Sequence, residues 1–133
     1  MVVTPDNSSL IVAETYTHRL MAFDIAVDGS LSNRRVWADL PDAFPDGISL
    51  DAEGAIWYAD VSGKRCVRVA QGGRMLQAIE LDRQCFACTL GGVDGRTLFM
   101  MVAQYPPTSW APDAPRTGVV LTTEAPAPRA GWP

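Results

Sequence analysis

The chain has 133 residues, of which 47% are apolar and 20% are charged, and this balance is typical of a globular domain rather than of a disordered segment. The net charge of −4 and the lack of a basic cluster argue against a nucleic-acid partner. No apolar run approaches the ~18 residues of a membrane helix, and the first residues lack the pattern of a secretion signal. We therefore expect a cytoplasmic protein with no membrane partner, and its odd number of cysteines, three, fits a reducing compartment.

Short β-rich runs follow one another along the chain, separated by Gly, Pro, Asp and Asn. No long window shows the i, i+3, i+4, i+7 spacing of an amphipathic helix. In chain order, the predicted strands are Ser9–Thr15, Leu20–Ile25, Arg35–Leu40, Gly47–Leu50, Ile56–Asp60, Cys66–Ala70, Leu76–Leu81, Phe86–Leu90, Leu98–Ala103 and Gly118–Glu124. So many short strands with short turns predict an all-β sandwich, barrel or propeller.

Three turns that begin with aspartate and lead into an apolar strand recur at a nearly constant spacing. They begin at Asp6, Asp51 and Asp94, which lie 45 and 43 residues apart. A period of about 40–45 residues with four strands is the signature of a propeller blade. We therefore predict about three blades of four-stranded antiparallel sheet over residues 1–124, followed by a loose, proline-rich tail over residues 125–133.

The number of blades is too small for a closed propeller. Closure needs at least four blades, or about 160 residues at this period. Three blades alone would leave strand edges unpaired and an apolar face exposed to water. We therefore expect either a propeller that lacks its N-terminal half or an arc that pairs with another copy or another partner.

Several segments resemble, in their order and spacing, the regucalcin/gluconolactonase (senescence marker protein, SGL) family. They are Leu31–Trp37, Pro45–Ile48, Leu50–Gly54, Arg65–Val69 and Leu90–Gly92. The resemblance runs from Met1 to about Ala103 and favours this family over related propellers of the strictosidine-synthase or paraoxonase type. It implies that the chain is the C-terminal half of a six-bladed propeller. It also implies hydrolysis of sugar lactones with one divalent cation near the central channel.

Pro45-Asp46-Gly47 resembles the metal loop of this family, and Asp46 is the only family metal ligand that the chain carries. The resemblance implies two further ligands from earlier blades, a Glu and an Asn, and the Asn would fall just before Met1. Asp46 would bind the cation, which is calcium in the first place, with zinc, magnesium or manganese as alternatives. It would also orient or deprotonate the water that attacks the lactone. The other interpretation is a plain turn, because Pro, Asp and Gly dominate turns.

The alternation of loops in a four-stranded blade predicts which segments share the end of the molecule where Asp46 lies. These segments are 16–18, 61–64, 83–85 and 104–115. The last of them is rich in proline, and we hypothesise that its Trp110 covers the channel mouth. His18 either contacts a substrate or is incidental. Glu14 and Asp60 either line the channel or only form ion pairs with Arg19 and Lys64.

Cys85 and Cys88 form a Cys-x-x-Cys motif, which raises the question of a metal or redox site. We expect structural cysteines instead, because residues three apart on a strand point to opposite faces. Cys66 is likewise predicted to be a small buried residue.

Two functions are compatible with this sequence. The first is a fragment of a divalent-metal-dependent lactonase, incomplete on its own, whose substrate is a small-molecule sugar lactone. The second is a non-catalytic or degenerate propeller fragment that self-associates or binds a partner.

Overall fold

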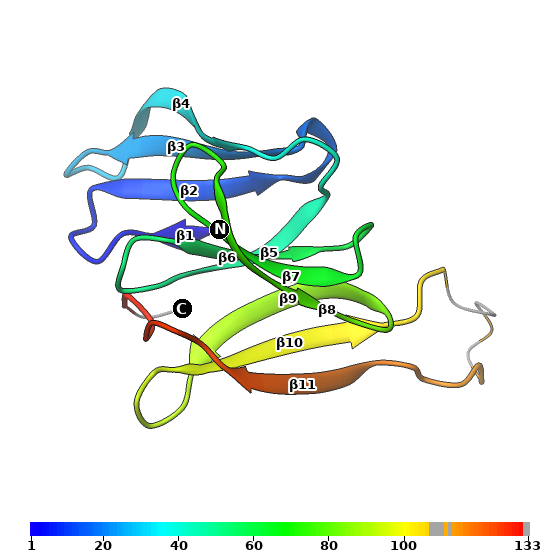
Figure 1. Ribbon diagram of the computed structural model, residues 1–133. Helices are drawn as coiled ribbons and strands as arrows, with labels where there is room; N and C mark the ends of the chain where they lie inside the picture. The colour runs from blue at the N-terminus through cyan, green and yellow to red at the C-terminus, as the bar shows by residue number, and fades with distance from the viewer. Residues whose placement is uncertain (107–110, 112, 132–133) are drawn as a thin grey trace.

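The computed structural model describes residues 1–106, 111 and 113–131. Within these residues the backbone forms eleven β-strands and one short 3-10 helix. The strands make three antiparallel sheets that follow one another in chain order, as Figure 1 shows. The all-β prediction is therefore confirmed, and each sheet is one blade of a partial β-propeller. No helix among the described residues has the length and apolar character needed to span a bilayer.

The first sheet contains four strands whose order follows the sequence. They are β1 (Val2–Val3), β2 (Ser9–Glu14), β3 (Arg19–Ile25) and β4 (Leu31–Asp39), and the 3-10 helix η1 (Thr15–Thr17) joins β2 to β3. Strand β1 is absent from the strands predicted by pattern, because two residues cannot show alternation, although residues 1–6 resemble a strand of the family at this position. The predicted outer strand begins at Arg35 instead of Leu31, because the first four residues of β4 are exposed and only Leu31 among them is apolar.

The second sheet confirms the prediction of a complete middle blade. Its strands are β5 (Pro45–Leu50), β6 (Ile56–Asp60), β7 (Arg65–Val69) and β8 (Met75–Glu80). Strand β6 has the predicted bounds. Its five residues are all buried, and the turn before it contains Gly54 with a left-handed backbone (φ 76°) that favours glycine.

The third sheet has three strands among the described residues. They are β9 (Gln84–Gly91), β10 (Thr97–Ala103) and β11 (Val119–Glu124). Strand β10 lies in the middle and pairs with β9 on one side and β11 on the other. The outer edge of β11 has no strand beside it in this part of the chain.

Strands β1, β5 and β9 form the inner edge of the molecule. Each lies at one edge of its sheet, and β5 contacts both β1 and β9. Gly47 marks the closest approach of β5 to β9, because a Cβ atom there would lie 2.6 Å from the Cα atom of Ala87. This convergence is the arrangement expected around the axis of a propeller.

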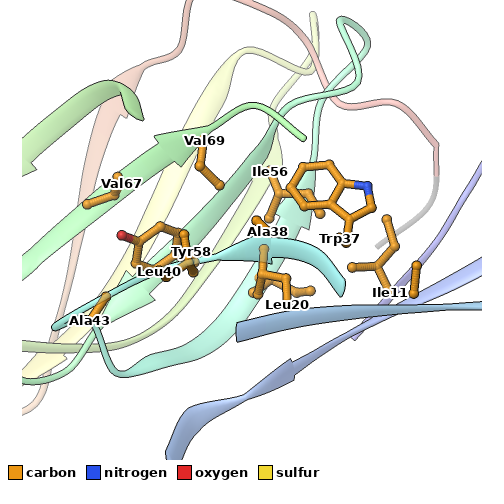
Figure 2. Close-up of a cluster of buried hydrophobic side chains, with 12 residues drawn as sticks. Ile11, Leu20, Trp37, Ala38, Leu40, Ala43, Ile56, Tyr58, Val67 and Val69 are labelled. Carbon is orange, nitrogen blue, oxygen red and sulfur yellow. The ribbon is translucent and has the colours of Figure 1, made fainter. Parts of the chain in front are cut away.

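The sheets are held together by two apolar clusters, one at each sheet–sheet interface. Figure 2 shows the cluster between the first and second sheets, to which the first sheet contributes Ile11, Leu20 and Trp37 and the second contributes Ile56, Tyr58, Val67 and Val69. The second and third sheets meet through the other face of β6, where Trp57 packs with Leu98 and Met100. Successive residues of β6 therefore serve opposite interfaces, as the period of two in a strand requires.

Cys66, Cys85 and Cys88 all point into the cluster between the second and third sheets. The three thiols are free and buried, so the structural interpretation of these cysteines is confirmed. A hydrogen bond with Cys66 and burial raise the pKa of the Cys85 thiol, which therefore stays protonated.

The prediction that Cys85 and Cys88 point to opposite faces is wrong, and a β-bulge is the reason. The register of β9 against β10 shifts between Met101 and Val102, which leaves Phe86 without a partner. The extra residue reverses the alternation locally, so that two positions three apart share one face.

The described residues of the C-terminal tail, 125–131, pack on the sheets, and the prediction of a loose tail is wrong for them. Ala125 and Ala127 are buried. The Arg129 amide donates to the Gly95 carbonyl at 3.0 Å, and Arg129 also forms an isolated β-bridge with Asp51. The tail therefore links turns of the second and third sheets, and its extended course suits the fixed backbone of proline.

Asp60 is a fully buried carboxylate at the end of β6. It accepts hydrogen bonds from the amide of Phe44 at 3.0 Å and from the amide of Gly63 at 3.2 Å. Its second oxygen accepts one from Nε of Arg65 at 2.9 Å, and the Arg65 side chain is partly buried. Asp60 thus fixes the segment that leads into β5 and the loop that follows β6.

We predict that Asp60→Asn lowers the free energy of unfolding by about 2–4 kcal/mol. The amide leaves the Arg65 guanidinium without a negatively charged partner, and its NH₂ group faces other hydrogen-bond donors. The control is Asp39→Asn, whose partner Arg19 is solvent-exposed, so its loss should stay below about 1 kcal/mol. Urea unfolding measures both. Equal losses for the two variants would contradict the structural role of Asp60.

Candidate functional site

A cavity of about 600 Å³ lies at one end of the three sheets, and each sheet contributes to its wall. The first sheet and its connection supply Thr15 and Tyr16, the second sheet region supplies Phe44, Asp46, Val61 and Ser62, and the third supplies Gln84, Phe86 and Tyr105. The four segments predicted to share the end where Asp46 lies each contribute to this wall. That part of the prediction is therefore confirmed.

Asp46 is the second residue of the inner strand β5, so the plain-turn interpretation of its segment is wrong. The register of β5 against β6 shifts between Pro45 and Ile48. Asp46 lies in this irregular stretch, where its side chain is exposed and lines the cavity. Thr15 supports the position by donating a hydrogen bond from its hydroxyl to the Pro45 carbonyl at 2.8 Å.

Among the described residues, no donor makes a hydrogen bond to the carboxylate of Asp46, and no cationic side chain pairs with it. Desolvation by the surrounding wall raises its pKa above the ordinary value, and the nearby α-ammonium of Met1 opposes this rise. A carboxylate with a raised pKa is a stronger base than an ordinary one, and its oxygens are free to contact a ligand.

The remaining cavity wall is aromatic and polar without further carboxylates in the described part. The rings of Phe86 and Tyr105 meet edge to face with centroids 6.0 Å apart. The side-chain oxygen of Gln84 accepts a hydrogen bond from the Tyr105 amide at 3.0 Å, and this bond ties the end of β10 to the start of β9. Aromatic surfaces with a few polar groups are typical of sites for small polar molecules.

His18, Glu14 and Asp60 do not line the cavity. His18 has a left-handed backbone (φ 57°), and its Nδ1 lies 2.6 Å from the Ala43 carbonyl oxygen. Its ring packs edge to face on Phe44, so it supports the segment before Asp46.

The two acidic residues form ion pairs instead, although not with the predicted partners. Glu14 binds Arg34 at 2.8 Å, and Asp60 binds Arg65. Trp110, the residue hypothesised to cover the channel mouth, lies outside the described residues.

The described side chains do not by themselves fit a metal ion. No group of three or more His, Cys, Asp or Glu side chains in residues 1–106, 111 and 113–131 could hold one. Asp46 offers one carboxylate, whereas calcium takes six to eight oxygen ligands. Any cation at Asp46 would therefore take its remaining ligands from water, from backbone or amide oxygens, or from outside this part of the chain.

The predicted segments include Tyr16, Gln84 and Tyr105 of the wall but not Phe44 and Phe86. Phe44 and Phe86 carry no functional signal in the sequence, because an aromatic residue beside a strand usually packs in the core.

Comparison with known proteins shows which family this chain resembles. The sequence pattern described as "SMP-30/Gluconolactonase/LRE-like region" matches residues 1–104. Regucalcin from Danio rerio is 36% identical over 87 residues, which cover 62% of this chain and 30% of that protein. The 6-deoxy-6-sulfogluconolactonase of Pseudomonas putida is 28% identical over 138 aligned positions, which cover 100% of this chain and 47% of that protein.

A solved structure shows the same fold. The calcium-binding protein regucalcin from Agrobacterium tumefaciens superposes with a TM-score of 0.74 at 20% identity, covering 98% of this chain and 45% of that one. The chain therefore has the fold of a partial six-bladed β-propeller and spans about a third to a half of the length of the relatives it matches. Because the family pattern covers most of its residues, the chain belongs to the SMP-30/Gluconolactonase/LRE-like family.

Proposed function

We propose that this chain is part of a divalent-metal-dependent hydrolase of sugar lactones, in which Asp46 is the catalytic carboxylate and one ligand of the metal. The observation that carries the proposal is the unpaired carboxylate of Asp46 in a cavity shared by three sheets. The relatives support the substrate class, because one of them is a sulfogluconolactonase and another an L-arabinolactonase.

Asp46 suits the role of a general base. Hydrolysis requires a water molecule to lose a proton as it attacks the lactone carbonyl, after which the ring C–O bond breaks and the ring oxygen takes up a proton. A carboxylate with no other partner can orient that water and accept its proton.

The metal part of the proposal concerns the ligand role of Asp46 alone. A single carboxylate leaves most of a coordination shell to water, so the chain on its own should bind a cation weakly. We propose calcium, because the Agrobacterium tumefaciens relative is a calcium-binding protein, with zinc, magnesium and manganese as the ions to compare. The remaining ligands would come from the blades that precede Met1 in longer relatives. We also propose a cytoplasmic location, which the three free thiols support.

The second candidate function is association without catalysis. It is supported by apolar side chains that stay exposed on the outer faces of the first and third sheets, among them Val36 and Val120.

We predict that Asp46→Asn lowers kcat/KM for glucono-lactone hydrolysis by about 100-fold or more, because the amide cannot accept the proton of water. The chain is assayed with added calcium, both alone and with the N-terminal half of the Pseudomonas putida relative. The matched control is Asp94→Asn, in a hairpin outside the cavity, which should leave the rate unchanged. Activity that survives in the Asp46 variant, or that is absent from every mixture, would refute the proposal.

We also predict that Asp46→Asn raises the free energy of unfolding at neutral pH. The folded pKa of Asp46 is raised, so the charged form destabilises the folded state above that pKa, and the gain from the variant should shrink as the pH falls toward the ordinary value.

Asp24→Asn is the control of opposite sign. Hydrogen bonds from Asn33 and Arg35 lower the pKa of Asp24. This variant should therefore be less stable than the wild type at neutral pH, and the difference between the two should disappear on acidification. Denaturant unfolding at several pH values measures both variants. A loss of stability in both at neutral pH would show that Asp46 is an ordinary paired carboxylate.

A further inference from the structure

The first and second sheets have equivalent registers, and in each an acidic residue lies opposite an arginine at the end of the second strand. Glu14 at the end of β2 pairs across the strands with Arg19, and Asp60 at the end of β6 pairs in the same way with Arg65. Counting back from these pairs matches each residue of β2 and β3 with one of β6 and β7.

Each sheet therefore has one face turned toward the preceding sheet, here called the first kind, and one turned toward the following sheet, the second kind. In the second sheet, the first kind is formed by Ile56, Tyr58, Val67 and Val69, and it packs on the first sheet. The equivalent residues of the first sheet are Leu10, Val12, Met21 and Phe23. No sheet of the described chain covers this face. It continues with Val36, which pairs with Met21 and is 49% exposed.

The second kind of face is left open on the third sheet. In the second sheet this face includes Trp57 and Ala59 and packs on the third sheet. The corresponding residues of β10 are Phe99 and Met101, which point away from the core and are partly exposed. Val120 pairs with Met101 across the strands and is 60% exposed.

A shallow hollow of about 370 Å³ runs over this open face of the third sheet. Phe86, Met101 and Val120 contribute to its wall. The two open faces are thus of the two kinds that already meet twice within the chain, once between the first and second sheets and once between the second and third.

We propose that two copies of this chain associate head to tail, the open face of the third sheet on the open face of the partner's first sheet, and close one ring of six sheets. A second copy fits because the chain spans 45% of the regucalcin-like propeller it resembles, so that three sheets make half a turn. A head-to-tail contact closes a ring when its rotation completes a full circle, and here two half-turns do so.

The ring completes the cavity as well as the fold. Rotation by a half-turn about the channel axis keeps the two ends of the channel distinct, so both copies of Asp46 open to the same end. The partner copy supplies the missing wall and a second carboxylate. Association itself does not depend on lactone hydrolysis, whereas any use of the paired carboxylates rests on the proposed function.

Analytical ultracentrifugation of the 133-residue chain over a range of concentrations tests the proposal. The expected species has twice the 14.4 kDa of one copy. Val36→Asp and Val120→Asp should each weaken the dimer at least about tenfold, because a charge is buried without a partner. Both side chains are about half exposed or more in one copy, so circular dichroism of the variants should be unchanged. Val93→Asp, at a fully exposed turn, is the matched control and should not change the mass.

A chain that stays monomeric at every concentration would overturn the proposal, and so would open polymers that grow with concentration. The same holds for a monomer that binds the N-terminal half of a relative but not itself, and for a Val93 variant as damaging as the other two. Asp46→Asn separates the two proposals, because it should leave the dimer mass unchanged. Loss of lactone hydrolysis from every sample with an intact dimer would count against the proposed function alone.

Discussion

The alternation of side chains along each β-strand is the constraint on which this structure depends. Neighbouring residues of β6, such as Ile56 and Trp57, point to opposite faces, and both faces are buried between sheets. A strand in the middle of the stack must therefore be buried on both faces, as all five residues of β6 are, and it is apolar up to the buried Asp60 at its end. Strands of the outer sheets follow the same pattern, although only one of their faces is covered within the described chain. The order of sheets, the position of the inner edge and the cavity at its end all follow from this stacking.

Asp46 and Asp60 show how the same side chain takes different roles from its surroundings. Asp60 is buried and receives hydrogen bonds from two amides and from Arg65, so its charge is used to fix two loops. Asp46 lies at the start of the neighbouring strand β5 of the same blade. It receives no hydrogen bond among the described residues, and desolvation raises its pKa. Native proteins keep an unpaired carboxylate at some cost in stability, and such groups concentrate where chemistry takes place. The Asp60 carboxylate binds the amide of Phe44, two residues before Asp46. The buried carboxylate therefore fixes the segment on which the exposed one lies.

Much of the fold could be predicted from the sequence, because the signals were local and repeated. Strand β6 and the end of the molecule occupied by Asp46 follow from alternation and from the regular spacing of turns. The bulge at Phe86 could not be predicted, because one extra residue in a strand leaves no mark on an apolar pattern. The packing of the tail could not be predicted either, because its contacts with Gly95 and Asp51 are made by backbone atoms, which carry no sequence signal. The cavity wall depends on residues far apart in the chain, of which only Asp46 was distinguished by its motif.

The central claim is that Asp46 is held in the cavity as an unpaired, partly desolvated carboxylate, and its own titration tests this most directly. NMR detection of the side-chain carboxyl carbon, with Asp46→Asn to assign the resonance, gives the pKa without any assay of activity. The structure predicts a pKa above the ordinary value for aspartate, in contrast with Asp24 and Asp28, whose hydrogen bonds lower theirs. A pKa of Asp46 at or below the ordinary value would show that the carboxylate is paired or fully solvated, and it would contradict the site as described.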